Sequence, residues 1–328
     1  MGRWSGRGPG AGASRPLEPG GGAHVSMETR PYLLHALSPL HAGTGQSVGV
    51  IDLPIARLRA TNIPYVPGSS LKGVLREARR STLPAPEWEA LFGPLRAVSG
   101  PEGDEAREGD HAGALVVGDA RLVALPVRSF SGTFALVTSP LLLELARRDL
   151  AGLEGLPGRL ARMDGPVARV GEKNVTVFPK HQRVFLEDLD LDARVDPAVD
   201  GWARFLTRAV PEEAELVRER FVVVDDETMS FLMETATQVD TRVRIDHATG
   251  TVAEGALWTE ESLPAETLLL GLLAAGPSLR SGTALSTSEV LGRALSGAPV
   301  LQLGGKATVG RGRCRLATWS RDAKEARR

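Results

Sequence analysis

Short stretches in which hydrophobic and polar residues alternate make up much of the chain, and other stretches place their hydrophobic residues three or four positions apart. Alternation is typical of β-strands, and the wider spacing is typical of one face of a helix. The pattern predicts strands over residues 32–40, 114–125, 129–138, 176–186, 221–224, 267–274, 300–303 and 313–319. It predicts helices over residues 69–81, 140–150, 212–220, 227–237 and 286–295.

Two more alternating stretches, residues 239–246 and 251–258, flank His247-Ala-Thr-Gly250, which is typical of a β-hairpin turn. Helices and strands are therefore intermixed with hairpins along the chain. A regular strand-helix alternation would predict a doubly wound parallel sheet instead. We predict an α+β fold built on an antiparallel sheet.

The start of the helix predicted from Ser69 is a candidate anion site. It follows Pro67 and Gly68, and either Ser69 or Ser70 is the expected N-cap. The free amides and dipole of a helix start attract anions, and Lys72 adds a positive charge. The alternative is that the serine only caps the helix and Lys72 faces solvent.

Two glycine-rich loops are further candidates. The loop at residues 302–312 holds four glycines beside Lys306 and Arg311, so its amides can approach an extended anion; alternatively it is a hairpin turn with solvated charges. The loop at residues 41–49 begins at His41 and is followed by Asp52. Asp52 could bind a hard cation or accept a proton, or could only cap a turn, and His41 could be structural.

The overall charge hides a segregation of charges along the chain. A net charge of −1 over 328 residues is unlike a typical nucleic-acid-binding domain. However, residues 42–80 hold six basic and two acidic residues, and residues 300–315 hold four basic and none acidic. Acidic residues gather at residues 187–200. Because both basic segments coincide with candidate anion sites, this distribution favours a phosphate-bearing ligand.

Composition bounds the domain organisation. Residues 1–26 hold 8 Gly and 3 Pro, which predicts a disordered tail. Residues 27–328 are predicted to form one domain with a loop at 100–113 and a mobile insertion at 151–173.

No run of about 18 apolar residues occurs, so no membrane span is expected. The single Cys314 excludes a disulfide framework and suits a reducing compartment, so we expect a cytoplasmic protein.

Several motifs, in order along the chain, resemble the RAMP superfamily. They are Leu40-His-Ala-Gly-Thr-Gly45, Gly49-Val-Ile-Asp-Leu-Pro-Ile55, Pro67-Gly-Ser-Ser-Leu-Lys-Gly73, Gly113-Ala-Leu-Val-Val-Gly-Asp-Ala120, Pro126-Val-Arg-Ser-Phe-Ser-Gly132, Glu187-Asp-Leu-Asp-Leu191, Arg242-Val-Arg-Ile-Asp-His-Ala-Thr-Gly250, Gly255-Ala-Leu-Trp-Thr-Glu-Glu261 and Gly304-Gly-Lys-Ala-Thr-Val-Gly-Arg-Gly312. Within that superfamily they are similar to the backbone subunits, the fourth Cmr protein, of type III-B (Cmr) CRISPR effector complexes.

This resemblance implies a ferredoxin-like (RRM-type) core with inserted subdomains and a projecting β-hairpin thumb, which we place at residues 239–261. It implies a metal-dependent endoribonuclease that binds guide RNA along its phosphate backbone and cleaves paired target RNA at regular intervals. The implied partners are guide RNA, target RNA, copies of the chain itself and other Cmr subunits. The implied cofactor is a divalent metal, Mg²⁺.

The resemblance also assigns roles to residues of this chain. Asp52 is the expected catalytic carboxylate and metal ligand, and His41 is a second catalytic candidate. The residues expected to bind RNA are Gly43, Gly45, Ser69, Ser70, Lys72, Arg128, Ser129, Arg242, Arg244, Gly304, Gly305, Lys306, Gly310 and Arg311.

Three other functions stay open at this point. The chain could be a structural RNA-binding subunit that does not cut, and Asp52 is the residue that distinguishes this case. It could be a stand-alone enzyme that holds a nucleotide in its glycine-rich loops, or an endonuclease that processes guide RNA without metal.

Overall fold

A computed structural model describes residues 27–43, 51–94, 111–163, 165–297 and 300–319. The predicted disordered tail, Gly45 and most of the loop at 100–113 lie outside these residues. The strands are β1 (Glu28–Ala36), β2 (Tyr65–Val66), β3 (Leu115–Val117), β4 (Ala120–Arg128), β5 (Phe134–Thr138), β6 (Val167–Val170), β7 (Val177–Phe178), β8 (Arg183–Leu186), β9 (Leu189–Val195), β10 (Phe221–Val223), β11 (Gln238–Ile245), β12 (Val252–Ser262), β13 (Leu268–Ala275), β14 (Val300–Gln302) and β15 (Arg313–Thr318).

The helices are α1 (Gly68–Arg80), α2 (Ala85–Phe92), α3 (Pro140–Asp149), α4 (Pro197–Leu206), α5 (Ala214–Arg220), α6 (Asp226–Thr235) and α7 (Thr287–Leu295). Short 3-10 turns cover Pro211–Glu213 and Ala307–Val309. Among the described residues, no helix is both long and apolar enough to cross a membrane.

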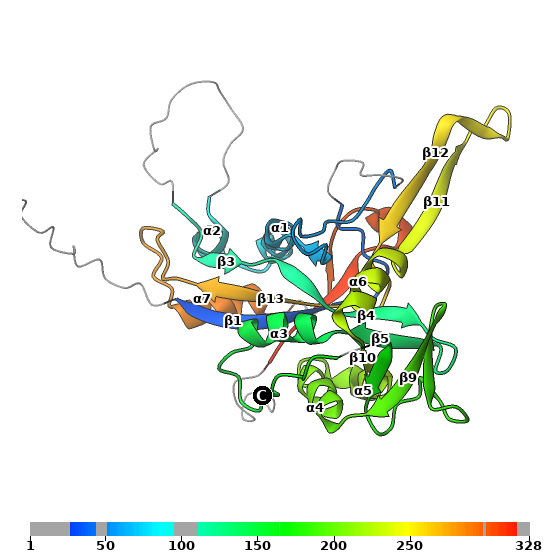
Figure 1. Ribbon diagram of the computed structural model, residues 1–328. Coiled ribbons are helices and arrows are strands. Elements are labelled where there is room, and N and C mark those ends of the chain that lie inside the picture. Colours follow the sequence, from blue (N-terminus) through cyan, green and yellow to red (C-terminus); the bar gives the residue numbers. More distant parts are fainter. Residues whose placement is uncertain (1–26, 44–50, 95–110, 164, 298–299, 320–328) are drawn as a thin grey trace, which may run out of the picture.

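One large sheet runs through the body of the molecule (Figure 1). Its strand order is β14-β15-β1-β13-β4-β5-β10-β6-β9-β8-β7, with β2 paired to β4 and β3 to β13. The α+β expectation is confirmed. The sheet is mixed where an antiparallel one was expected, because β5 and β10 run parallel, as do β6 and β9. The chain between β5 and β10 includes α3, α4 and α5, which gives it the length that a parallel connection requires.

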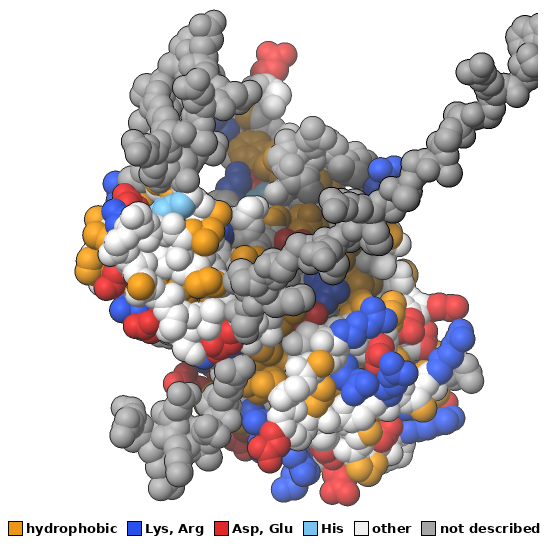
Figure 2. All heavy atoms as spheres, turned by 90° about the vertical axis from the view of Figure 1, so that its left-hand side faces the viewer, with side chains coloured by type: hydrophobic (Ala, Val, Ile, Leu, Met, Phe, Trp, Pro, Cys, Tyr) orange, Lys and Arg blue, Asp and Glu red, His pale blue; other side chains and the backbone are white. Residues whose placement is uncertain are grey.

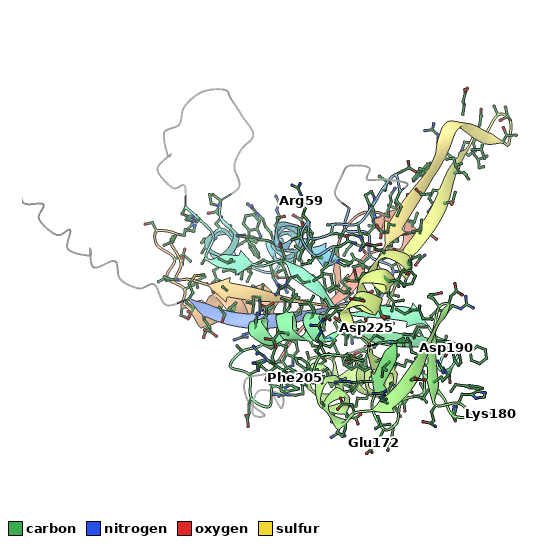
Figure 3. All side chains as sticks on the ribbon, viewed as in Figure 1. Arg59, Glu172, Lys180, Asp190, Phe205 and Asp225 are labelled. Atoms are coloured by element: carbon green, nitrogen blue, oxygen red, sulfur yellow. The ribbon has the colours of Figure 1, made fainter. Side chains whose placement is uncertain are left out.

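Alternate residues of the central strands enter two different hydrophobic clusters. On β1, Leu34 belongs to a cluster shared with α1, α2 and α7, whereas Leu33 belongs to one shared with α3, α4 and α5. Successive side chains of a strand point to opposite faces, so both faces of the central sheet are covered. Phe205, labelled in Figure 3, stacks on Trp319 in the second cluster with ring centroids 5.8 Å apart.

This part of the fold includes three elements that the sequence pattern did not predict: β6, β9 and α2. The insertion predicted at 151–173 ends in the buried strand β6, which pairs with β9 and β10. The acidic segment at residues 187–200 contains β9 and the first residues of α4. Pro84 and Pro86 stand at the start of α2, where a missing amide hydrogen costs no hydrogen bond.

β11 and β12 form a separate two-stranded sheet that projects from the body (Figure 1). The hairpin predicted around residues 247–250 is confirmed, and its pairing extends from Gln238 opposite Ser262 to Ile245 opposite Val252. β12 is longer than the predicted strand by four residues at its C-terminal end. Those added residues lie at the base of the hairpin, where it meets the body.

The two signs of charge are interspersed on the molecular surface. Lys and Arg side chains lie among Asp and Glu side chains over the lower half of the face shown in Figure 2. The labelled Lys180 and Asp190 lie at the β7–β9 end of the molecule in Figure 3. Both signs of charge therefore lie side by side on this face, although they are segregated along the chain.

Candidate functional site

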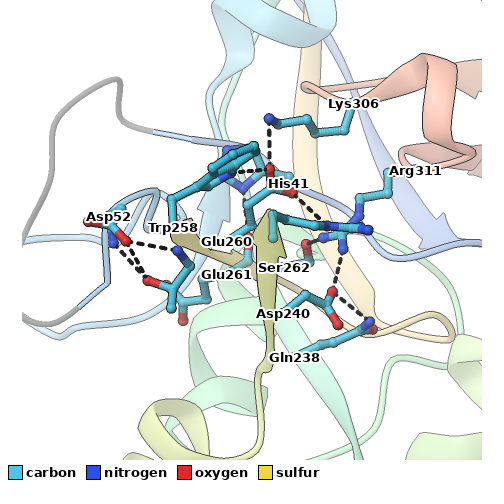
Figure 4. A network of polar contacts seen from close by, with 12 residues as sticks. His41, Asp52, Gln238, Asp240, Trp258, Glu260, Glu261, Ser262, Lys306 and Arg311 are labelled. Carbon is cyan, nitrogen blue, oxygen red and sulfur yellow. Dashed lines mark hydrogen bonds and ion pairs between the residues drawn. The ribbon is translucent and has the colours of Figure 1, made fainter. Parts of the chain in front are cut away.

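Asp52 is fixed to strand β12 at the base of the hairpin (Figure 4). Its Oδ2 accepts hydrogen bonds from the backbone amide of Thr259 at 2.8 Å and from the Thr259 hydroxyl at 3.0 Å. In return, the Asp52 amide donates to the Thr259 Oγ1 at 3.1 Å. The next residue, Leu53, exchanges two backbone hydrogen bonds with β12. The segment that carries Asp52 is thus attached to β12 through both backbone and side chain.

The environment of Asp52 keeps its carboxylate charged and accessible. The residue is exposed, and the hydrogen bonds from Thr259 hold the pKa of its carboxyl below the ordinary value. Within the described ranges, Oδ1 makes no hydrogen bond to protein. Asp52 therefore offers one free, ionised oxygen that can accept a hydrogen bond from a hydroxyl group or bind a cation.

His41 is buried where three segments of the chain meet. Its Nδ1 lies 2.6 Å from the carbonyl oxygen of Glu261 on β12. Because a carbonyl can only accept, Nδ1 must carry a proton, and in the neutral ring Nε2 is then the acceptor. The His41 carbonyl in turn accepts a hydrogen bond from the Gly305 amide at 3.0 Å. His41 therefore joins the first loop to both β12 and the C-terminal loop.

Glycines at this junction are needed for close packing. A Cβ at Gly43 would lie 2.7 Å from the Nε2 of His41. A Cβ at Gly304, whose φ is +71°, would lie 2.2 Å from the His41 carbonyl oxygen. By contrast, a Cβ at Gly310 would meet nothing within 4 Å. Gly43 and Gly304 thus have a packing role beside His41, and Gly310 lies in open space.

Alternate residues of β12 serve the two loops separately. Trp258, Glu260 and Ser262 contact the C-terminal loop, whereas Thr259 and Glu261 contact the segment around Asp52 (Figure 4). This alternation follows from the two-residue period of a strand. β12 therefore holds both loops at the base of the hairpin.

Lys306 is bound to a buried carboxylate of β12. Its Nζ lies 2.8 Å from the Oε1 of Glu260, which also accepts a hydrogen bond from the Trp258 indole at 2.8 Å. Arg242 of β11 lies 3.5 Å from the other carboxylate oxygen of Glu260. Burial opposes ionisation of Glu260, but Lys306, Trp258 and Arg242 outweigh it and lower its pKa. Lys306 and Arg242 are therefore already paired with Glu260 before any contact with RNA.

Arg311 differs from the surface position expected of an RNA contact. It is 4% exposed, and its guanidinium donates to Ser262 and to Asp240 of β11. Arg57 is similarly bound to the buried Glu261 at 2.6 Å. The placement of Arg311 favours a structural role, in which it fastens the C-terminal loop to the hairpin.

The start of α1 forms a second part of the candidate site. Ser69, Lys72 and Arg76 line an open groove of about 780 Å³ together with residues 92–94, 111–113 and 115–117. Burial, and then the charge of Arg76, lower the pKa of Lys72. Lys72 has no carboxylate partner within the described ranges. It is thus a half-buried cation facing a groove.

The expected serine N-cap of α1 is wrong. Pro67 occupies the N-cap position without a side-chain hydrogen bond, and Ser69 and Ser70 are exposed within the first turn of the helix. Asp119, between β3 and β4, accepts a hydrogen bond from the Gly68 amide at 2.7 Å. A carboxylate distant in sequence therefore satisfies the first helix amide, which a phosphate was expected to approach.

The remaining predicted RNA contacts lie on two other elements. Arg128 is exposed at the end of β4, and the adjoining Ser129 is buried and pairs with Leu186 of β8. Arg244 is exposed on β11, farther along the hairpin than Arg242. The structure brings His41, Asp52 and Lys306 together around β12, and it leaves Arg128 and Ser129 on another strand.

Sequence reasoning missed the residues that hold the site together: Asp119, Asp240, Thr259, Glu260 and Glu261. The last three stand in the motif at residues 255–261, which was placed in the thumb, but no role was assigned to any of them individually. The run of four consecutive polar residues at 259–262, at the end of a hairpin strand, is the sequence signal that could have indicated two polar faces.

A ready-made metal cage is absent from the part of the chain that the structure describes. No group of three or more His, Cys, Asp or Glu side chains there could hold a metal ion. Asp52 presents an exposed carboxylate there, and its Oδ1 makes no hydrogen bond to another described residue. Proteins commonly bind Mg²⁺ through one or two carboxylates together with substrate phosphates, and a single exposed carboxylate such as Asp52 fits a site of that kind.

Comparisons with known proteins agree with this architecture. The model of the RAMP superfamily matches residues 33–315. The CRISPR system Cmr endoribonuclease Cmr4 of Pyrococcus furiosus is 34% identical over 284 residues, which cover 85% of this chain and 92% of that protein.

Solved structures are similar over most of the chain. The crystal structure of oligomeric Cmr4 from Pyrococcus furiosus has a TM-score of 0.67 at 26% identity, covering 90% of this chain and 100% of that one. A subunit in the cryo-EM structure of the type III-B Cmr-beta complex bound to cognate target RNA has a TM-score of 0.64 at 19% identity, covering 89% and 97% of the two chains. The latter likeness concerns the fold alone.

Proposed function

The chain belongs to the RAMP superfamily and, within it, to the Cmr4 family, and on that premise we propose that it is an RNA-guided endoribonuclease. It acts as a backbone subunit of a type III-B CRISPR complex and cleaves target RNA paired with the guide. The observation that carries this proposal is the exposed, ionised Asp52 carboxylate, fixed by Thr259 at the base of the hairpin.

The low pKa of Asp52 limits the chemistry that it can perform. A carboxylate that holds its charge strongly is a weak proton acceptor, so bulk proton abstraction is not its main contribution. Its free Oδ1 can instead accept a hydrogen bond from a ribose 2′-hydroxyl and orient that hydroxyl toward the adjoining phosphorus. When bound by Asp52 and by phosphate oxygens of the target, Mg²⁺ would supply positive charge that offsets charge building up on the phosphate.

His41 supports this site through structure. Its Nδ1 proton is engaged with β12, and Gly43 packs against its Nε2. A proton-transfer role would require Nε2 to reach the RNA. We therefore assign His41 to holding the loops in place, and Asp52 to the reaction.

The grip on guide RNA is proposed to come from α1 and the C-terminal loop. Lys72, with Ser69 beside it, faces a groove where a phosphate backbone can lie, and Lys306 stands beside Trp258 on the other side of the hairpin base. Such contacts bind phosphates without reading bases. Sequence choice is then left to base pairing with the guide.

The arrangement of the subunit follows from the same proposal. We assign the ferredoxin-like core to the central strands β1, β4 and β13 with their helices, and the thumb to β11–β12. The thumb interrupts the guide–target duplex, and copies of the chain stack along the guide with other Cmr subunits in the cytoplasm.

Replacing the carboxylate tests this function. In a complex reconstituted with guide RNA, the Asp52→Ala subunit should abolish target cleavage and leave target binding within about twofold. Asp188→Ala removes another exposed carboxylate, between β8 and β9, and should cut normally. Undiminished cutting by Asp52→Ala with binding intact would refute the assignment and favour a structural RNA-binding subunit.

A further inference from the structure

Among the described residues, Thr259 makes all the hydrogen bonds to the Asp52 carboxylate. Its hydroxyl donates to the Asp52 Oδ2 at 3.0 Å and accepts from the Asp52 amide at 3.1 Å. Its own backbone amide donates to the same Oδ2 at 2.8 Å. One residue of β12 thus closes a small ring of hydrogen bonds around one carboxylate oxygen and leaves the other oxygen free.

Without this ring, nothing described around Asp52 would fix its rotamer. The side chain is exposed and takes part in no ion pair among the described residues, so it could rotate among its staggered wells. Reactions that depend on positioning lose much of their rate when a group is misplaced by about 1 Å. The direction of Oδ1 therefore depends on the hydrogen bonds made by Oδ2.

Thr259 is itself held firmly. Leu53 accepts from the Glu261 amide and donates to the Thr259 carbonyl, so the backbone on both sides is paired. On the opposite face of β12, Glu260 is bound to Lys306, and Ser262 is bound to Arg311. A support of this kind, built on a packed strand, orients a functional group more accurately than a free loop does.

Thr259 also joins the carboxylate to the projecting hairpin. It lies opposite Thr241 in the register of β11 and β12. Any displacement of β12 by a ligand of the hairpin would be passed to Asp52 through the same three hydrogen bonds. The position of the Asp52 carboxylate is therefore coupled to the position of the hairpin strand β12.

We propose that Thr259 is the positioning residue that orients the Asp52 carboxylate for target cleavage and couples it to the hairpin. This inference rests on the proposed function, because it requires Asp52 to be the catalytic group. It concerns orientation only, and assigns Thr259 no contact with the reacting atoms.

Three substitutions in the reconstituted complex test the proposal. Thr259→Val removes the hydroxyl and keeps a β-branched side chain of similar size, whereas Thr259→Ser keeps the hydroxyl. Thr241→Val removes the equivalent hydroxyl from the facing residue, which makes no hydrogen bond to Asp52, and serves as the matched control. Each complex is measured for target affinity and, at saturating complex, for the single-turnover cleavage rate.

We expect Thr259→Val to slow cleavage by about 10- to 100-fold, the range for loss of a hydrogen bond to a charged group, with target affinity within twofold. Thr259→Ser should restore the rate to within about threefold, and Thr241→Val should leave it unchanged. A purely structural role would lower affinity or assembly instead, and serine would not selectively restore the rate. If the valine variant fails to assemble, Thr259→Ala is measured and the same loss is expected.

Two results separate this inference from the proposed function. If Asp52→Ala is inactive but Thr259→Val and Thr259→Ala cut at the wild-type rate, Thr259 does not position the carboxylate, although Asp52 still acts. If Asp52→Ala cuts normally, the proposed function itself fails.

Discussion

At the scale of single residues, the site is a carboxylate whose two oxygens do different things. Thr259 occupies the Oδ2 of Asp52 with two hydrogen bonds, and Oδ1 remains available. The same hydrogen bonds stabilise the charged form, so a single neighbour sets both orientation and protonation state.

The pH dependence of cleavage follows from this environment. The pKa of Asp52 is lowered, so in the folded protein this carboxylate stays ionised even at a pH equal to its ordinary pKa of about 3.9. Any stability from its hydrogen bonds is fully present above that unfolded-state value and is lost as pH falls through the lower folded-state value. We expect the single-turnover rate at saturating complex to show no midpoint belonging to Asp52 between pH 5 and 8. A midpoint near pH 6 that moves in Thr259→Val would contradict this.

Asp52 could be found from the sequence and Thr259 could not, for a physical reason. Asp52 is identifiable because it follows a glycine-rich loop in a recognisable motif. Thr259 is 207 positions away, and only the pairing of β12 with the segment around Leu53 brings the two together. Arg311 is likewise basic in sequence, but the fold buries it against Asp240 and Ser262.

At the scale of elements, β12 and α1 carry the site in different ways. β12 holds two loops through alternate side chains, whereas α1 presents Lys72 to a groove and depends on close packing at its first residue. A Cβ at Gly68 would lie 2.2 Å from the carbonyl oxygen of Val117. The position of α1 therefore requires glycine there.

Two glycines of α1 provide a matched test of this packing. Gly68→Ala should lower the free energy of unfolding by about 1–3 kcal/mol, because the backbone of β3 must move. Gly73→Ala meets nothing within 4 Å and should raise it by up to about 1 kcal/mol through helix propensity. Urea unfolding of both variants measures the difference, and equal changes would contradict the packing described for Gly68.

Elements with an uninterrupted hydrophobic period are predictable from the sequence. Elements that contain or follow prolines, acidic residues or glycines are not. α1, α3, α7 and the β11–β12 hairpin lie within a few residues of their predicted bounds, because their hydrophobic spacing is uninterrupted. α2 is hidden by Pro84 and Pro86, and β9 by its acidic residues, which lie on exposed positions of a strand. β6 is hidden because it follows a glycine-rich segment.

At the scale of the whole molecule, binding to RNA should depend on a few unpaired cations. Five of the ten basic residues in the two basic segments are paired with a carboxylate among the described residues: Arg57, Arg80, Lys306, Arg311 and Arg315. Lys72 has no such partner among the described residues. Net charge is therefore a poor guide to this protein, because the carboxylates that balance it lie beside the cations in space.

The salt dependence of guide-RNA binding tests this distribution. Lys72→Ala should flatten the slope of log affinity against log salt by about 0.7, the value for one phosphate contact on a single strand. Lys306→Ala should flatten it less, because Glu260 already neutralises that lysine. Arg80→Ala, at the end of α1 and paired with Glu77, is the control and should leave the slope unchanged. An unchanged slope for Lys72→Ala would contradict the proposed groove.

The most direct test of the account is cleavage by complexes assembled from mixtures of wild-type and Asp52→Ala subunits, with the cut positions mapped along the target RNA. If every copy carries its own cleaving carboxylate, the wild-type complex makes evenly spaced cuts, their total yield falls in proportion to the variant fraction, and the all-variant complex binds target without cutting it. The same cuts at undiminished yield in the all-variant complex would contradict the account.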